Sequence, residues 1–284
     1  MNCAWQAYLN ILPHWMRAEV DAYGRDDLQE LRIRTGLQPE MICRRGSYTV
    51  SRRATKEDIT FIINAASEYS PWAAGTIKNG YLTAAGGHRI GICGLATVSD
   101  KTMLGISVPT SLCMRVARDF VGIGDNAADM TGSVLIIGPP GSGKTTLLRD
   151  LIRCKSDRGA GSVAVVDERE ELFPSYKGQP CFYPGKHTDI LSGCSKAEGI
   201  EAVLRSMNPE WIAVDEITGQ TDCEALLHAG WCGVNIMATA HAGSLEDLKN
   251  RPVYKPMIDK KLFSTVIILR KDKSWTVERI SLCQ

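Results

Sequence analysis

The residues best suited to chemistry lie in a glycine-rich run between a short apolar segment and a segment with helical spacing. They are Gly138, Pro139, Pro140, Gly141, Ser142, Gly143, Lys144, Thr145 and Thr146. Glycine lets consecutive backbone N–H groups converge on phosphate oxygens, and a helix that begins near Lys144 adds its positive end. Lys144 would reach the β- and γ-phosphates, the Thr145 hydroxyl would bind Mg²⁺, and Thr146 would support the phosphate cradle. The pattern is a P-loop, which predicts a site for ATP and Mg²⁺.

An acidic pair follows another apolar run farther along the chain. Residues 211–214 lead directly into Asp215 and Glu216. Asp215 would hold Mg²⁺ through water, and Glu216 would act as the general base on the attacking water. Hydrolysis of the bound triphosphate is the predicted reaction. A non-catalytic nucleotide switch is disfavoured because Lys144, Thr145 and both acids are present.

Two further strand ends carry polar side chains. One apolar run ends in Asp167 and Glu168, on a strand expected beside that of the P-loop, so Glu168 is a second catalytic candidate. The alternative for these acids is solvation or a salt bridge to Arg169. Another core strand leads to His241, which would sense whether the γ-phosphate is present. Metal binding by His241 is not expected, because no second His or Cys stands nearby and Mg²⁺ prefers oxygen ligands.

An arginine from a neighbouring subunit would complete such a site, because the transition state places charge on the phosphoryl oxygens. The candidates are Arg205, Arg169, Arg115 and Arg89. Arg205 is a catalytic candidate on this ground, although the sequence does not choose among the four.

The elements that position these residues divide the chain near residue 120. Residues 1–120 combine a strand with period-two alternation at 28–34 and a helix capped by Thr55, and they contain no catalytic motif. Residues 121–284 alternate between strands and helices, which predicts a mainly parallel sheet with helices on both faces. The predicted fold class is α/β, a RecA-like P-loop ATPase core preceded by a smaller α+β N-terminal domain.

Composition restricts the surroundings of the protein. The chain has 284 residues, a formal net charge of +1 and 44% hydrophobic residues, which argues against general coating of nucleic acid or strong attraction to acidic lipid. No apolar run approaches the length of a membrane span, and the N-terminus lacks the features of a secretory signal. The ten cysteines are scattered, and those in apolar runs, Cys93, Cys113 and Cys232, indicate buried reduced thiols. We therefore expect a cytoplasmic protein that contacts a membrane through a partner.

Longer motifs give the chain a family resemblance. They are residues 138–150, 166–169, 196–200, 205–210, 215–217 and 238–242, with 30–34 and 88–91 in the N-terminal part. On these motifs the chain resembles the type II and type IV secretion ATPases, and within that superfamily most closely the stage III sporulation protein AA family. One departure is Thr218, where the family pattern has Gly; it would alter the loop after Glu216 without removing an essential group.

The resemblance implies a homo-oligomeric ring, a hexamer, with ATP between the N-terminal and ATPase domains and an Arg entering from a neighbour. It also implies partners among the proteins of a membrane-embedded sporulation or secretion complex. The protein would associate peripherally with that complex on its cytoplasmic, mother-cell side. The predicted function is an Mg-ATP hydrolysing motor that energises assembly of, or transport through, the complex.

The alternative function is a nucleic-acid translocase, because ring ATPases with related cores move DNA or RNA. The neutral net charge and the lack of an aromatic and basic stripe argue against it, so no specific nucleic acid is expected. A small-molecule kinase would need an acceptor site and a lid, and the sequence indicates neither.

Overall fold

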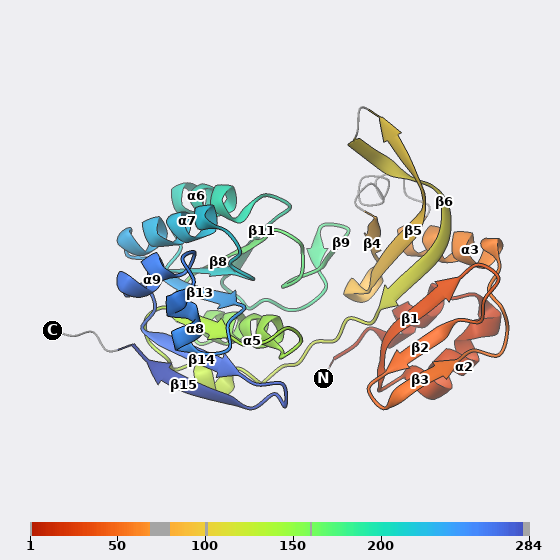
Figure 1. Cartoon of the computed structure of the whole chain (residues 1–284), viewed down its shortest axis with the longest axis horizontal. Coiled ribbons are helices and arrows are strands. Elements are labelled where there is room, and N and C mark those ends of the chain that lie inside the picture. The colour runs from red at the N-terminus through yellow and green to blue at the C-terminus, as the bar shows by residue number, and fades with distance from the viewer. Residues whose placement is uncertain (1, 69–79, 100–101, 160, 281–284) are drawn as a thin grey trace. The chain divides into compact units, whose positions relative to one another are not determined.

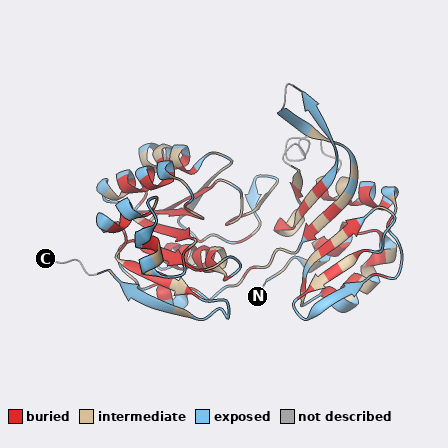
Figure 2. Ribbon diagram, viewed as in Figure 1, coloured by how far each residue is buried: buried red, intermediate tan, exposed pale blue. Residues whose placement is uncertain are grey.

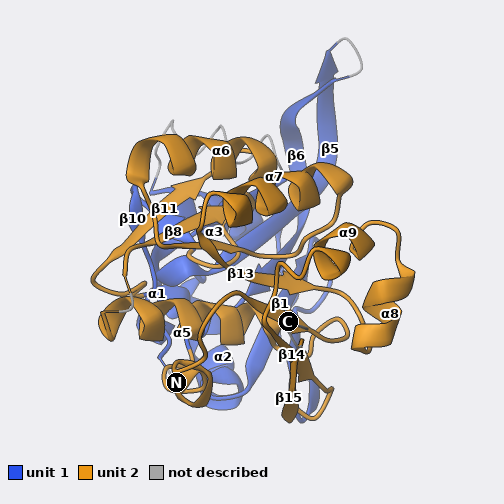
Figure 3. Cartoon of the chain, turned by 90° about the vertical axis from the view of Figure 1, so that its left-hand side faces the viewer, with its two compact units in different colours: residues 1–119, 174–182 blue, residues 120–173, 183–284 orange. Residues whose placement is uncertain are grey.

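The computed structural model describes residues 2–68, 80–99, 102–159 and 161–280 (Figure 1). The chain divides into two compact units (Figure 3). Unit 1 comprises residues 1–119 and 174–182, and unit 2 comprises residues 120–173 and 183–284. Among the described residues, no helix has the length and apolar character needed to cross a lipid bilayer.

Unit 1 is built on an antiparallel sheet with strand order β3-β2-β1-β6-β5-β4. Its strands are β1 (Leu28–Arg34), β2 (Glu40–Cys43), β3 (Gly46–Thr49), β4 (Tyr81–Thr83), β5 (Arg89–Ser99) and β6 (Thr102–Arg115). Its helices are α1 (Trp5–Asn10), α2 (His14–Gly24) and α3 (Lys56–Ser67), with the 3₁₀ turn η2 (Ala85–Gly87). Thr55 and Asp58 form a capping box at the start of α3, which confirms the predicted helix start. The predicted helix stop at Ser70-Pro71 lies outside the described residues.

A fully buried histidine links two segments of unit 1. The Nδ1 atom of His88 accepts a hydrogen bond from the Ala117 N–H at 3.1 Å, and Nε2 lies 3.0 Å from the Ala4 carbonyl oxygen, to which it donates. Burial lowers the pKa of His88, and the hydrogen bond to Ala4 opposes that shift in part. The folded protein therefore binds this proton less readily than the unfolded chain does.

We expect unit 1 to lose stability as pH falls from about 6.5, the ordinary pKa of histidine, through the lower folded value. Above pH 6.5 both states carry neutral His88, so its contribution is fully present there. Denaturant unfolding at pH 7.5 and 5.5 would measure the loss. His88→Gln, which stays neutral, should reduce the pH dependence, whereas the same change at the exposed His14 should not. Equal pH dependence in wild type and His88→Gln would refute this prediction.

A short hairpin belongs to unit 1 although it lies between strands of unit 2 in the sequence. It consists of β9 (Ser175–Tyr176) and β10 (Gln179–Pro180). The Tyr176 hydroxyl and the Lys177 ammonium both donate to the Glu68 carboxylate. A Cβ atom at Gly87 would lie in tight contact, 3.2 Å from Cys181 Cβ, and Gly87 has φ 81°, in the region that favours glycine.

The described residues of unit 2 form a seven-stranded sheet with strand order β11-β8-β12-β13-β7-β14-β15. The strands are β7 (Val134–Ile137), β8 (Val163–Asp167), β11 (Thr188–Ser192), β12 (Trp211–Val214), β13 (Asn235–Ala240), β14 (Thr265–Leu269) and β15 (Trp275–Arg279). All neighbouring pairs are parallel except β14 with β15. Every residue of β7, β8 and β12 is buried, as expected for parallel strands covered on both faces (Figure 2).

Helices cover the two faces of this sheet, as predicted. They are α5 (Lys144–Asp157), α6 (Lys196–Met207), α7 (Gln220–Trp231), α8 (Leu245–Asn250) and α9 (Lys255–Asp259), with the 3₁₀ turn η3 (Asp125–Ala127). α6 and α7 pack together on one face, and α5 lies on the other (Figures 1 and 3). Leu135 and Val214 of the sheet share a buried cluster with Ile200 of α6 and Leu226 of α7.

Two expectations from the sequence are wrong. β8 does not lie beside β7, because β12 and β13 occupy the positions between them. The chain crosses from β7 through α5 to β8 and fills the two intervening positions only later, so Glu168 is placed beside the strand of Asp215 instead. Cys93 and Cys232 are exposed and Cys113 is half-buried, because Cys93 lies where β5 extends past β4 and pairs with β6 alone, and Cys232 follows the last turn of α7.

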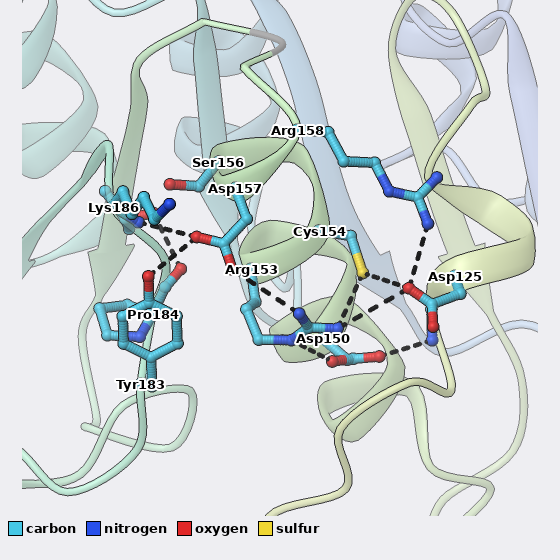
Figure 4. A network of polar contacts seen from close by, with 12 residues as sticks. Asp125, Asp150, Arg153, Cys154, Ser156, Asp157, Arg158, Tyr183, Pro184 and Lys186 are labelled. Atoms are coloured by element: carbon cyan, nitrogen blue, oxygen red, sulfur yellow. Dashed lines mark hydrogen bonds and ion pairs between the residues drawn. The ribbon is translucent and has the colours of Figure 1, made fainter.

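A polar network holds α5 to the segments around it (Figure 4). The nearly buried Asp150 accepts hydrogen bonds from the Gly124 N–H at 2.7 Å and from Arg153 Nε at 2.7 Å. Farther along the helix, Asp157 accepts from the Tyr183 hydroxyl at 2.9 Å. Burial raises the pKa of the Cys154 thiol to about 12, so this cysteine stays protonated in the network. The half of α5 from Asp150 to Asp157 is therefore fixed to the segments around it.

Candidate active site

The P-loop residues 138–143 connect the end of β7 to the start of α5. Gly143, at the N-cap of α5, has φ 101°, in the region that favours glycine. A Cβ atom at Gly138 would lie 2.7 Å from the Leu269 carbonyl oxygen, so the turn passes too close to β14 for a larger residue. The Ser142 hydroxyl is buried and, among the described residues, has no hydrogen-bond partner. Such an unpaired group inside the loop fits a site that is completed by phosphate oxygens.

Lys144 points back over the loop that precedes it. Its Nζ atom donates to the carbonyl oxygens of Gly138 at 3.1 Å and Pro139 at 3.2 Å, and it lies 3.1 Å from His241 Nδ1. Burial lowers the pKa of Lys144, while the nearby carboxylates of Asp215 and Glu216 oppose that shift. The Lys144 ammonium is buried, and its hydrogen-bond partners are neutral groups. It is therefore suited to bind an anion that carries more negative charge than the two nearby carboxylates.

Two threonines hold Asp215. The Thr145 hydroxyl donates to Asp215 Oδ2 at 2.7 Å, and the Thr239 hydroxyl donates to Oδ1 at 2.5 Å. Thr239 is fully buried at the end of β13, and its oxygen also accepts the Glu216 N–H at 2.8 Å. Thr145 and Asp215 together offer the hydroxyl and carboxylate oxygens that Mg²⁺ prefers.

His241 bridges Lys144 and Glu216. Its Nε2 atom lies 3.2 Å from Glu216 Oε1, while Nδ1 faces the Lys144 ammonium. Since an ammonium only donates, Nδ1 accepts and Nε2 carries the proton that is donated to Glu216. Glu216 has φ 52°, a left-handed conformation that is uncommon outside glycine and turns its side chain into the site. The three side chains form a continuous chain of hydrogen bonds.

These side chains line a pocket of about 450 Å³. Its lining is Pro140, Gly141, Gly143, Lys144, Thr145, Thr146, Glu171, Asp215, Glu216, Thr239, His241 and Lys273. The volume is in the range of ordinary small-ligand sites. The residues fit a nucleotide with Mg²⁺, because the glycine-rich loop and the ammonium groups suit phosphate and the Thr145 and Asp215 oxygens suit Mg²⁺.

A small niche adjoins the pocket at the end of β8. It is lined by Val166, Asp167, Glu168, Arg169, Glu171, Lys196, Asp215 and Glu216. The Asp167 carboxylate accepts three backbone N–H groups, from Glu171, Leu172 and Phe173, at 2.8 to 3.0 Å. Burial nevertheless raises the pKa of Asp167, although these hydrogen bonds oppose the shift. Asp167 therefore closes the loop, and the adjacent Glu168 lines the niche together with the other acids.

The four candidate arginines are divided between the two units. Arg169 NH1 lies 3.8 Å from Glu216 Oε2, at the rim of the site. Arg205 is exposed on α6 and donates to the Glu201 carbonyl oxygen at 3.1 Å. Arg115 and Arg89 belong to unit 1, where Arg115 Nε lies 3.4 Å from Glu30 and Arg89 stacks over Tyr81.

The contacts of three residues of the site were not predicted from the sequence. Thr239 holds Asp215, Lys196 contacts Glu168, and Lys273 donates from the turn after β14 to the Gly141 carbonyl oxygen. Thr239 lies at the end of β13 and Lys273 follows β14, and both strands neighbour β7. These strands end at the edge of the sheet that carries the P-loop, so the strand order would have indicated both residues. Thr218 donates to Asp222 at the start of α7, which keeps the loop after Glu216 closed.

The sequence matches known proteins along nearly its whole length. A family model described as "Sporulation stage III, protein AA" matches residues 7–280. Stage III sporulation protein AA of Bacillus subtilis (strain 168) is 35% identical over 276 residues, covering 93% of this chain and 90% of that protein. An uncharacterized ycf45 protein of Cyanidium caldarium is 29% identical over 180 residues, covering 59% of this chain and 52% of that protein.

Two solved structures resemble the fold. The Legionella pneumophila ATPase DotB has a TM-score of 0.58 at 17% identity, covering 93% of this chain and 77% of that one. The pilus retraction motor PilT, solved with bound ADP, has a TM-score of 0.58 at 15% identity, covering 88% and 76%. At these identities the likeness concerns the fold, and it confirms the predicted class of an α/β P-loop ATPase core with a separate α+β N-terminal domain.

Proposed function

The chain belongs to the sporulation stage III protein AA family, and on that premise we propose that it is an Mg-ATP hydrolysing motor. The observation that carries the proposal is the convergence of Lys144, the Thr145–Asp215 pair and Glu216 on one pocket. A phosphate-binding lysine, a pair of oxygen ligands and a carboxylate beside them are the parts that triphosphate hydrolysis requires.

Each side chain has one task in this mechanism. Lys144 and the N–H groups of the P-loop bind the β- and γ-phosphates. Thr145 and Asp215 hold Mg²⁺, which when bound neutralises charge on the phosphate oxygens. Glu216 takes the proton of the attacking water.

His241 couples the phosphates to Glu216. When Lys144 turns from His241 toward the γ-phosphate, Nδ1 loses its donor, and the contact between Nε2 and Glu216 changes with it. When the γ-phosphate is lost, Lys144 returns to His241 Nδ1. The hydrogen-bond chain would thus report the state of the nucleotide to the loop after β12.

The motor would act as a homo-oligomeric ring, a hexamer, in which an arginine such as Arg205 completes the site of a neighbour. Its exposure in the single chain leaves Arg205 available for that role. Its partners would be proteins of a membrane-embedded sporulation complex, with the motor peripherally bound on the mother-cell side. The family membership and the fold shared with DotB and the PilT motor support this assignment.

ATP turnover per protomer, measured against protein concentration with Mg²⁺ present, tests this proposal. We expect a rate that rises with concentration and then saturates, because the site is completed between subunits. Chelation of Mg²⁺ should abolish the rate, and added DNA should not raise it. A measurable rate independent of concentration would contradict the arginine in trans. No turnover above that of Glu216→Gln would contradict hydrolysis itself.

A further inference from the structure

We propose that Lys196 is a positioning residue for ATP hydrolysis, which holds the Glu168 carboxylate at the niche beside Glu216. The Lys196 Nζ atom lies 2.6 Å from Glu168 Oε2, and its side chain is 6% exposed while that of Glu168 is 37% exposed. The lysine is thus fixed inside the protein, and the glutamate extends from it toward the niche. This inference rests on the proposed function and adds a residue to its machinery.

The position of Lys196 is electrostatically unfavourable without Glu168. It is the first residue of α6, where the positive end of the helix disfavours a cation. Burial of an ammonium group also costs free energy unless an anion compensates for the lost water. Glu168 is its one hydrogen-bond partner among the described residues. A single carboxylate therefore offsets both costs, which ties the position of each group to the other.

Strand register brings the ends of β8 and β12 together, and Glu168 and Glu216, which follow these ends, line one niche. Val166 of β8 pairs with Val214 of β12 in the parallel sheet, and each glutamate follows its valine by two residues. The niche that they share has a volume of about 10 Å³, which is about the space of one water molecule. A water between these carboxylates would have a proton acceptor on either side.

Repulsion would disperse these acids without a cation. Asp167, Glu171 and Asp215 also line the niche, so Glu168 faces several carboxylates there. The cations of the niche are Lys196 and Arg169, and the Arg169 side chain is 60% exposed and lies nearest Glu216. Lys196 is the buried cation of the two, and its ammonium is bound to Glu168. Lys196 therefore keeps the Glu168 carboxylate near Glu216.

Attachment of α6 to the sheet does not need this ion pair. A Cβ atom at Gly199 would lie 2.4 Å from Val166 Cγ1, so the helix already packs directly on β8. Ile200 and Val203 of α6 add buried apolar contacts. If Lys196 only attached α6 to the sheet, it would repeat what this apolar packing already does. A positioning role gives the Lys196–Glu168 ion pair a function of its own at the site.

The test compares Lys196→Met with Lys155→Met in the full-length protein. Lys155 is a matched buried lysine of α5, which stacks over Trp211 at 4.5 Å outside the site. We expect Lys196→Met to lower kcat at least about tenfold with KM for ATP within about threefold of wild type. Lys155→Met should leave both constants near wild type. Lys196→Arg, which keeps the charge, should restore kcat to within about threefold of wild type.

A double variant separates action through Glu168 from direct action. If Lys196 works through this glutamate, Lys196→Met should lower kcat by less than about twofold in a Glu168→Gln background. The positioning role would be overturned if the losses of kcat from Lys196→Met and Glu168→Gln multiplied in the double variant. A kcat near wild type in Lys196→Met, or loss of ATP binding in that variant, would also overturn it. Failure of Lys196→Arg to recover activity would also overturn it. If wild type shows no turnover, both this role and the proposed function fail; with active wild type, only the role of Lys196 is at stake.

Discussion

Glu216→Gln is expected to lower kcat for ATP by roughly 10²–10⁴-fold while ATP affinity stays close to that of wild type. Glutamine has nearly the same shape but cannot take a proton from water. The Lys144 ammonium and the Thr145–Asp215 pair remain, so the groups that bind phosphate and Mg²⁺ are unchanged. His241 Nε2–H can still donate to the amide oxygen. Steady-state turnover and equilibrium binding of a fluorescent ATP analogue would measure the two effects separately.

The matched control is Glu224→Gln, a change at an exposed glutamate of α7 that lies outside the pocket lining. It should alter neither turnover nor binding. Near-normal turnover in Glu216→Gln, combined with a large loss in Glu168→Gln, would move the role of general base to Glu168. Loss of ATP binding in Glu216→Gln would instead assign this residue to binding.

The chemistry-bearing segments could be predicted because each has a local signal. The P-loop has glycines at fixed positions, and the strand that leads to Asp215 is an uninterrupted apolar run. Alternation of strands and helices then predicts a parallel sheet, since parallel strands need crossover helices. These signals are short-range, and they predicted the strands that carry the site without a knowledge of their neighbours, whereas β11, α8 and α9 were not predicted.

Contacts between segments could not be predicted in the same way. An apolar run indicates a buried strand but not its place in the sheet, so β8 was expected beside β7 and is separated from it by β12 and β13. The position of Thr239 against Asp215 and that of His241 between Lys144 and Glu216 follow from β13 lying next to both β7 and β12. Without strand order, such side chains are only polar residues at strand ends.

Short elements also escaped prediction. β9 and β10 contain two residues each, too few for a period-two pattern. They lie with unit 1 because β9 packs near η2, and Tyr176 and Lys177 add contacts with Glu68; both partners are far away in the sequence. The buried position of Lys196 was equally hidden, because a lysine in the first turn of a helix is normally exposed to solvent.

Lys144→Ala is expected to weaken ATP binding by roughly 10–100-fold, the loss that follows from removing charged hydrogen bonds to phosphate. The effect should be larger for ATP than for AMP, because Lys144 is placed to reach the β- and γ-phosphates. Equilibrium titration with ATP, ADP and AMP would measure this order. The same substitution at the exposed Lys249 of α8 should change none of the three affinities.

The contact of Lys144 with His241 in the nucleotide-free structure predicts a second effect of Lys144→Ala. Lys144 donates to His241 Nδ1, which fixes the proton on Nε2 facing Glu216. Without the ammonium, His241 Nδ1 has no donor in either nucleotide state, so the contact of His241 with Glu216 no longer changes with the γ-phosphate even when ATP concentration is raised to saturation. We therefore expect kcat to fall along with affinity in Lys144→Ala. Unchanged ATP affinity would refute the P-loop assignment, whereas a pure affinity loss with normal kcat would retain it and exclude the coupling through His241.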